Sequence, residues 1–209
     1  MIFFVALVFL PLVASAQSSM SYGFEAGWNL ANLNVSPSTQ FPLSNRSTFM
    51  AAGFFEYQLN QSWSIQPELI YVQNGAKSNQ VGDTTIFKYD YIEIPLLLRA
   101  RSDYKIQTFD IYPSLFAGPS FGMNVNAQQE DDQTGFVTKR DLKSVTNGTN
   151  VTMDVGIGLE VPFNPGGSFV GDARYSFGLT NITTQNIQGE NTTIKTKGIQ
   201  FMGGLKIGI

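Results

Sequence analysis

The stretch YGFEAGWNL, residues 22–30, carries the pattern that decides the fold. Large apolar side chains and one alanine occupy the even positions from Tyr22 to Leu30, and Gly, Glu and Asn occupy the odd positions between them. A period of two places these sets on opposite faces of a β-strand, because successive side chains point to opposite sides of the pleat. One face of this strand is therefore predicted to be apolar, and the other polar or small.

The same alternation predicts seven further strands, at residues 49–59, 63–71, 92–101, 109–117, 151–161, 169–179 and 199–209. Short links lie at 60–61, 102–107 and 162–167, and long links follow the first strand and lie at 76–85, 123–150 and 180–197. An even number of strands, with both termini beside the short links, is the layout of bacterial outer-membrane barrels, whose long loops face the cell exterior. The predicted fold class is all-β, a single antiparallel up-and-down transmembrane β-barrel of about eight strands.

The face opposite the apolar one carries many charges in mid-strand positions, interleaved with glycine. The charged residues on this face are Glu25, Glu56, Glu68, Glu93, Arg99, Arg101, Asp110, Asp154, Glu160, Asp172, Arg174 and Lys206. The apolar face has no charge in the centre of any strand, as contact with lipid requires, because Lys or Arg at the bilayer midplane costs about 2–4 kcal/mol. We therefore predict that the apolar face points to lipid and that the charges form a structural network in a filled lumen. A soluble β-sandwich is the alternative interpretation.

Two details of the apolar face support the same interpretation. Aromatic side chains gather toward both ends of the strands, which predicts a girdle at each membrane interface. They are Trp28, Tyr57, Trp63, Tyr71, Tyr175 and Phe177. Lys88 and Asp90 share the parity of Ile92, but they lie toward the long-loop end, where we expect them above the bilayer.

Composition excludes several classes of function. The 209 residues contain no Cys and no His, which removes thiolate nucleophiles, imidazole bases and the usual transition-metal ligands. A net charge of −3 with scattered Lys and Arg predicts no nucleic-acid binding. We expect no enzyme activity and no cofactor, with an acid-only enzyme, using a pair such as Glu68 and Glu93, or a narrow pore as alternatives. Glu130, Asp131 and Asp132 could hold Ca²⁺, but a solvated charge run is the favoured interpretation, so no metal site is predicted.

Residues 1–16 have the features of a secretory signal peptide. An apolar run from Ile2 to Ala14 precedes the small-x-small site Ala14-Ser15-Ala16, and the run is shorter than the roughly 20 residues that a membrane-spanning helix needs. We predict cleavage after Ala16, which leaves residues 17–209 as the barrel domain. No basic residue precedes the apolar run, which indicates that the natural start lies upstream.

Several segments of the sequence resemble a known family. They are the G-x-x-x-G-W-N pattern at 23–29, QPELIYVQNG at 66–75, YDYIEIPLLL at 89–98, Ala117 to Pro119, and DARYSFGLTN at 172–181. Together they resemble the PorT-like outer-membrane β-barrel family of Bacteroidetes. This resemblance implies an eight-stranded barrel in the outer membrane. One member of that family is associated with secretion of extracellular proteases, so a surface, scaffold or secretion-associated role is expected.

The partners expected from this interpretation are outer-membrane lipid, a possible protein partner bound through the long loops, and the barrel assembly machinery during biogenesis. The chain ends in Ile209 rather than in the aromatic residue often found at the end of such barrels. This difference affects how strongly we expect the assembly machinery to interact with the chain.

Overall fold

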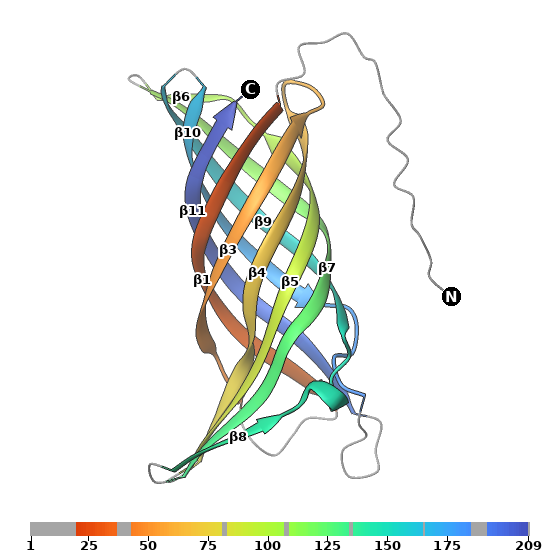
Figure 1. Cartoon of the computed structure of the whole chain (residues 1–209). Coiled ribbons are helices and arrows are strands. Elements are labelled where there is room, and N and C mark those ends of the chain that lie inside the picture. Colours follow the sequence, from red (N-terminus) through yellow and green to blue (C-terminus); the bar gives the residue numbers. More distant parts are fainter. Residues whose placement is uncertain are drawn as a thin grey trace, which may run out of the picture.

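Eight long strands close into a single ring in the computed structural model, which describes residues 20–36, 43–80, 83–106, 109–133, 136–164, 166–184 and 192–208 (Figure 1). The ring strands are β1(Met20–Ser36), β3(Arg46–Gln58), β4(Trp63–Gln80), β5(Asp83–Arg101), β7(Phe109–Gln133), β9(Thr149–Asn164), β10(Gly167–Gly178) and β11(Thr193–Gly208). Each pairs antiparallel with its neighbours in that order, and β1 pairs with β11 to close the ring. The predicted all-β barrel of eight strands is confirmed. The predicted signal peptide, residues 1–16, lies outside the described residues.

Three short strands and one helical turn lie off the ring. β2(Leu43–Ser44) pairs with β4, while β6(Tyr104–Ile106) and β8(Phe136–Asp141) pair with β7. The 3-10 turn η1(Lys143–Val145) follows β8. No helix in the described part of the chain is long and apolar enough to cross a membrane.

The exposure of the strands is inverted relative to a soluble protein. Outward-facing Trp28, Leu115 and Ile157 are 65%, 64% and 59% exposed, whereas inward-facing Glu25 and Glu68 are 2% and 3% exposed. Burying ionisable groups while leaving large apolar groups accessible is unfavourable in water, because water hydrates charges and is displaced favourably from apolar surface. The exterior of this barrel is therefore suited to lipid.

A tight turn joins β3 to β4 at the end where both termini of the ring lie. The Oδ1 atom of Asn60 accepts hydrogen bonds from the backbone N–H groups of Ser62 and Trp63, at 2.9 and 3.0 Å. Asparagine side chains stabilise turns in this way because they pair with backbone donors two or three residues later. The turn holds the ends of β3 and β4 in register at the short-turn end of the barrel.

The long-loop end differs from the sequence prediction, which assigned residues 76–85 and 123–150 to loops. β4 continues to Gln80 and β5 starts at Asp83, so the first of these segments is a β-hairpin. β7 likewise continues to Gln133 and turns back as β8. The polar residues of these segments give no apolar alternation, since neither face of the extended sheet contacts lipid. Backbone pairing with neighbouring strands, which local sequence does not reveal, keeps them extended.

A bulge interrupts the alternation at the same end. The register of β5 against β7 shifts between Asp90 and Tyr91, because two residues of β7 there oppose one of β5. Tyr89, Asp90 and Tyr91 are consequently three consecutive buried residues. The hydroxyl of Tyr71 and the amide of Asn126 donate to Asp90 Oδ2 at 3.4 and 3.0 Å. Asp90 is thus shielded by neighbouring polar side chains.

An apolar cluster fills the long-loop end of the lumen. Its inward-facing strand residues include Met50, Val72 and Tyr91, each 0% exposed. Leu142, beside η1, and Ile182, which follows β10, pack into the same cluster. The sequence prediction placed both residues in polar loops. Both residues reach the cluster from the segments that connect β8 to β9 and β10 to β11.

The lipid-facing surface can be tested with a matched pair of arginine substitutions. Ile157→Arg places a charge in the middle of the apolar exterior, whereas Val137→Arg places one on β8, beyond it; the native side chains are similarly exposed, at 59% and 57%. We expect Ile157→Arg to lower the free energy of unfolding in lipid vesicles by about 2–4 kcal/mol, and Val137→Arg to change it little. Urea titration, with heat-modifiable gel migration as the readout of the folded barrel, measures both. Equal losses in the two variants would contradict a lipid-facing exterior.

Candidate functional site

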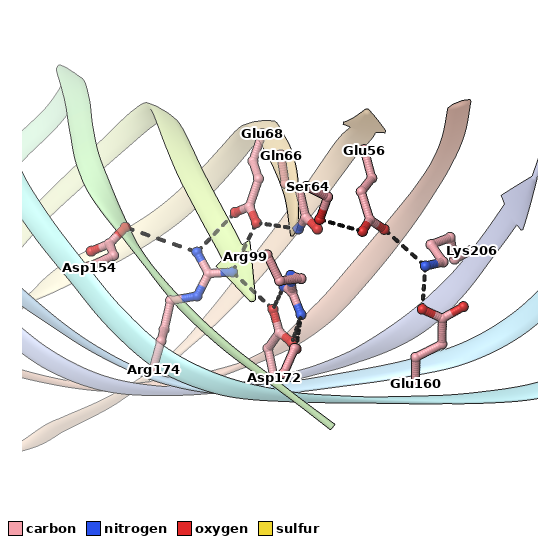
Figure 2. A network of polar contacts seen from close by, with 11 residues as sticks. Glu56, Ser64, Gln66, Glu68, Arg99, Asp154, Glu160, Asp172, Arg174 and Lys206 are labelled. Atoms are coloured by element: carbon pink, nitrogen blue, oxygen red, sulfur yellow. Dashed lines mark hydrogen bonds and ion pairs between the residues drawn. The ribbon is translucent and has the colours of Figure 1, made fainter. Parts of the chain in front are cut away.

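The lumen contains two groups of interacting charged side chains, and Arg174 of β10 is at the centre of one of them (Figure 2). The two terminal nitrogens of Arg174 donate to the two carboxylate oxygens of Glu68 on β4, at 2.9 and 3.1 Å. Asp172 lies 3.5 Å and Asp154 4.0 Å from the same guanidinium. Arg174 and Glu68 are fully buried, and their paired geometry is the strongest arrangement between these two groups. The pair joins opposite sides of the ring across the lumen.

Arg99 of β5 forms the second pair of this group. Its guanidinium donates to both oxygens of Asp172, at 2.6 and 3.1 Å, and to Ser114 Oγ at 2.9 Å. The ring of Phe116 packs against the guanidinium groups of both Arg99 and Arg174, with centroid distances of 4.5 and 5.2 Å. Asp172 therefore bridges two arginines that both contact the ring of Phe116.

Glycine makes room for this second pair. A Cβ atom at Gly158 would lie 2.3 Å from an Arg99 nitrogen and 2.5 Å from an Asp172 oxygen. Neither distance is possible between non-bonded atoms, so a larger residue at position 158 would displace the ion pair. Gly158 therefore provides the space that the Arg99–Asp172 pair occupies.

Lys206 of β11 is at the centre of the second group, near the short-turn end. Its ammonium donates to Glu56 Oε2 at 2.9 Å and to Glu160 Oε2. Ser64 and Ser168 donate to the other oxygens of these two carboxylates, at 2.7 and 2.8 Å. The group lines a polar cavity of about 240 Å³ that opens at this end of the barrel.

Arg101 lies at the rim of the same cavity. Its guanidinium is 3.9 Å from Glu160 and stacks 4.6 Å from the centroid of the Tyr112 ring. Asp110, which the sequence grouped with the lumen charges, lies further out: its register partner is Lys105, in the β6–β7 hairpin at the edge of the barrel. Asp110 is therefore apart from the network around Arg174, because the hairpin carries its part of β7 past the ring.

Two further lumen carboxylates lack a strong cationic partner among the described residues. One oxygen of Glu25 and one of Glu93 are buried without a hydrogen-bond partner there, and Ser120 reaches the other oxygen of Glu93 only at 3.5 Å. The ligand oxygens of Glu25, Glu68 and Asp172 lie within 4.8 Å of one another. The last two already hold Arg174 and Arg99, so this cluster is a set of ion pairs with one additional carboxylate.

The acidic run Glu130 to Asp132 is on a strand rather than in a loop. Lys88 lies 2.5 Å from Glu130, and Lys139 lies 3.4 Å from it. The hydrogen bond and the charge of Lys88 hold the pKa of Glu130 below its ordinary value, although desolvation opposes them. Asp131 instead accepts from Thr85 at 2.7 Å and from Gln129. Because neighbouring carboxylates on a strand point to opposite faces, Glu130 and Asp131 do not form a joint cation site.

A group of polar side chains around Gly75 lies beyond the apolar residues of β3 and β4 in the lumen. Gly75 adopts a φ of 137°, a conformation that side chains other than glycine rarely adopt. The carbonyls of the two preceding residues, Gln73 and Asn74, accept hydrogen bonds from Asn29, Thr48 and Arg46 at 2.7–2.9 Å. Along β3 and β4, from the short-turn end outward, the lumen side chains are therefore first charged, at Glu56 and Glu68, then apolar, at Met50 and Val72, and then polar, at Thr48 and Asn74.

A charged, filled lumen inside an apolar exterior defines an integral membrane β-barrel. The model of the family described as "Outer membrane protein beta-barrel domain" matches residues 15–184. The chain therefore belongs to this outer-membrane β-barrel family, and its location is the bacterial outer membrane. Among curated proteins, none matches the sequence.

Solved structures of outer-membrane proteins share the fold. OprG of Pseudomonas aeruginosa is 12% identical over 92% of this chain and 95% of its own, with a TM-score of 0.51. Neisserial surface protein A is 13% identical over 90% of this chain and 96% of its own, with a TM-score of 0.48. Ail of Yersinia pestis is 14% identical over 90% of this chain and 98% of its own, with a TM-score of 0.42. The similarity to OprG supports the fold, and the low identities carry no further conclusion.

The roles of two lumen carboxylates can be separated by the same chemical change. Glu68→Gln removes the charge that pairs with fully buried Arg174, and we expect a loss of about 3–5 kcal/mol in the free energy of unfolding, because a buried cation loses its partner. Glu25→Gln removes a charge that is in excess, so we expect unchanged or increased stability. Urea titration of both variants in vesicles provides the measurement. A greater loss for Glu25→Gln than for Glu68→Gln would show that the network is organised differently.

Proposed function

We propose that this protein is a non-enzymatic outer-membrane barrel with a closed lumen, which acts through the part of the sheet that extends beyond the bilayer. The observation that carries the proposal is the contrast between its two ends. Ion pairs and the apolar cluster fill the lumen, whereas β8 is exposed along its whole length. Transport through the barrel would require both the ion pairs and the apolar cluster to move out of the lumen. Binding at β8 requires no such rearrangement.

The extension, which we call the arm, consists of residues 76–80, 83–88, 128–133 and β8 (Figure 1). β8 is paired with β7 on one side, and its other edge has no strand partner among the described residues. Phe136 and Val137, at the start of β8, are 80% and 57% exposed. An unpaired strand edge with accessible apolar side chains can add an extended segment of another protein as a further strand. We therefore propose an extracellular protein partner at this edge.

The two alternatives from the sequence have less support. A catalytic pair of Glu68 and Glu93 would need access to substrate, but both residues are 3% exposed and Glu68 is held by Arg174. A narrow pore would have to pass the apolar cluster around Leu142 and Ile182. A filled lumen and an exposed arm together favour a surface or scaffold role, or a role in a secretion complex.

Within the outer-membrane family, we propose a PorT-like member. The phrases at 66–75, 89–98 and 172–181 support this relation. They contribute Glu68, Glu93 and Arg174, which lie in the lumen network. We also propose that residues 1–16 direct export and are removed, and that the barrel assembly machinery inserts residues 17–209 into the membrane.

Planar-bilayer recording tests the closed lumen. We expect the refolded protein to give no discrete channel openings at neutral pH, because ion pairs and the apolar cluster leave no continuous aqueous path. A porin recorded in the same bilayers is the control for incorporation. Stable open channels from the wild-type protein would overturn the closed-lumen proposal.

Site-specific photo-crosslinking in intact cells tests the arm. A photoreactive residue in place of Val137 should give an adduct with another protein, whereas one in place of Leu96, which is 49% exposed on the lipid-facing exterior, should not. Adduct mass on a denaturing gel is the measurement. The absence of a protein adduct at position 137 under conditions where the variant is folded and at the surface would contradict a partner at β8.

A further inference from the structure

The outward face of β11 changes from apolar to basic along its length. Ile207, Leu205, Gly203, Phe201 and Ile199 succeed one another on this face, followed by Lys197 and Lys195 toward the long-loop end. The apolar part spans nine residues, which matches the roughly 9–11 residues that a tilted strand needs to cross a bilayer. Lys197 therefore lies at the level of the lipid headgroups, and Lys195 lies just above it.

The neighbouring strand shows the same boundary. On β1 the outward apolar positions run from Tyr22 to Leu30, again nine residues, and are followed by Asn32 and Asn34. The register pairs Lys197 with Asn32 and Lys195 with Asn34. Two lysines and two asparagines thus form one outward patch above the apolar surface, which we call the β11 rim.

Charge is distributed unevenly around the barrel at this level. On the opposite side Lys88 is neutralised by Glu130, which lies 2.5 Å from it. At the β11 rim, neither lysine has an ion pair with a described residue, and the described outward positions of β1, β3, β10 and β11 contain no acidic residue. Among the described residues, the rim is therefore a positive patch without a neighbouring carboxylate, at headgroup depth.

We propose that the β11 rim binds the phosphate of a phosphorylated glycolipid in the outer leaflet. Side chains two positions apart on a strand are about 7 Å apart along it, so the two ammonium groups can approach one phosphate from both sides. The exposed side chain of Asn34 can pair with sugar hydroxyls. The acyl chains would lie against Ile199, Phe201 and Trp28 directly below. The rim would thereby fix one lipid to one side of the barrel.

The test uses the folded full-length barrel in neutral detergent micelles, titrated with lipid A and with dephosphorylated lipid A. Native mass spectrometry measures the ratio of lipid-bound to free barrel. Lys195→Gln/Lys197→Gln removes both charges of the rim. Arg140→Gln/Lys143→Gln removes two exposed charges at and beside β8 and is the matched control. Heat-modifiable migration establishes that all variants are folded.

We expect the wild type and the control variant to bind lipid A alike. The rim variant should bind it roughly 25-fold more weakly, since each Lys near an anionic surface contributes about a five-fold gain in affinity. The wild type should also bind dephosphorylated lipid A much more weakly than lipid A. Equal binding by the rim and control variants, or equal binding of the two lipids, would overturn the proposal.

Discussion

The ion pair of Arg174 with Glu68 is the interaction on which the rest of the barrel depends. It spans the lumen from β10 to β4, and neither side chain has contact with solvent. An eight-stranded ring has an interior that side chains just fill, so whatever occupies the centre determines what the neighbouring positions can hold. Arg174 also contacts Asp172, which in turn holds Arg99. One guanidinium therefore links the strands on opposite sides of the ring.

The exterior follows from the same constraint. Strand alternation sends every second residue inward, so a lumen filled with charges leaves the other set of residues for the outside. In water, such a barrel would expose its largest apolar side chains, whereas in a lipid bilayer the same exterior is satisfied. The membrane location is thus a physical consequence of the interior, and the family assignment agrees with it.

The two ends of the barrel have different chemistry. At the short-turn end Lys206 and its two carboxylates line an open polar cavity. At the long-loop end, Leu142 and Ile182 return from the connecting segments and complete an apolar cluster. The arm extends past this end and is exposed along β8, so the features accessible to a partner lie on the arm and the rim rather than among the buried side chains of the lumen. This arrangement underlies the proposed binding functions.

The amino-acid sequence determined the strand count and, within the apolar-alternating segments, the face of the strand residues, because a period of two is a local property of a regular strand. It also identified the inward charges, including Glu68, Arg99 and Arg174, since charge on one face and its absence on the other are visible in the pattern. Only the tertiary structure decided which acid pairs with which base, because those partners are up to 106 residues apart and meet through ring closure. Only the tertiary structure likewise decided the bulge at Asp90, the arm, and the packing of Leu142 and Ile182 in the apolar cluster. These features depend on backbone pairing and on packing between distant segments, so the local sequence does not reveal them.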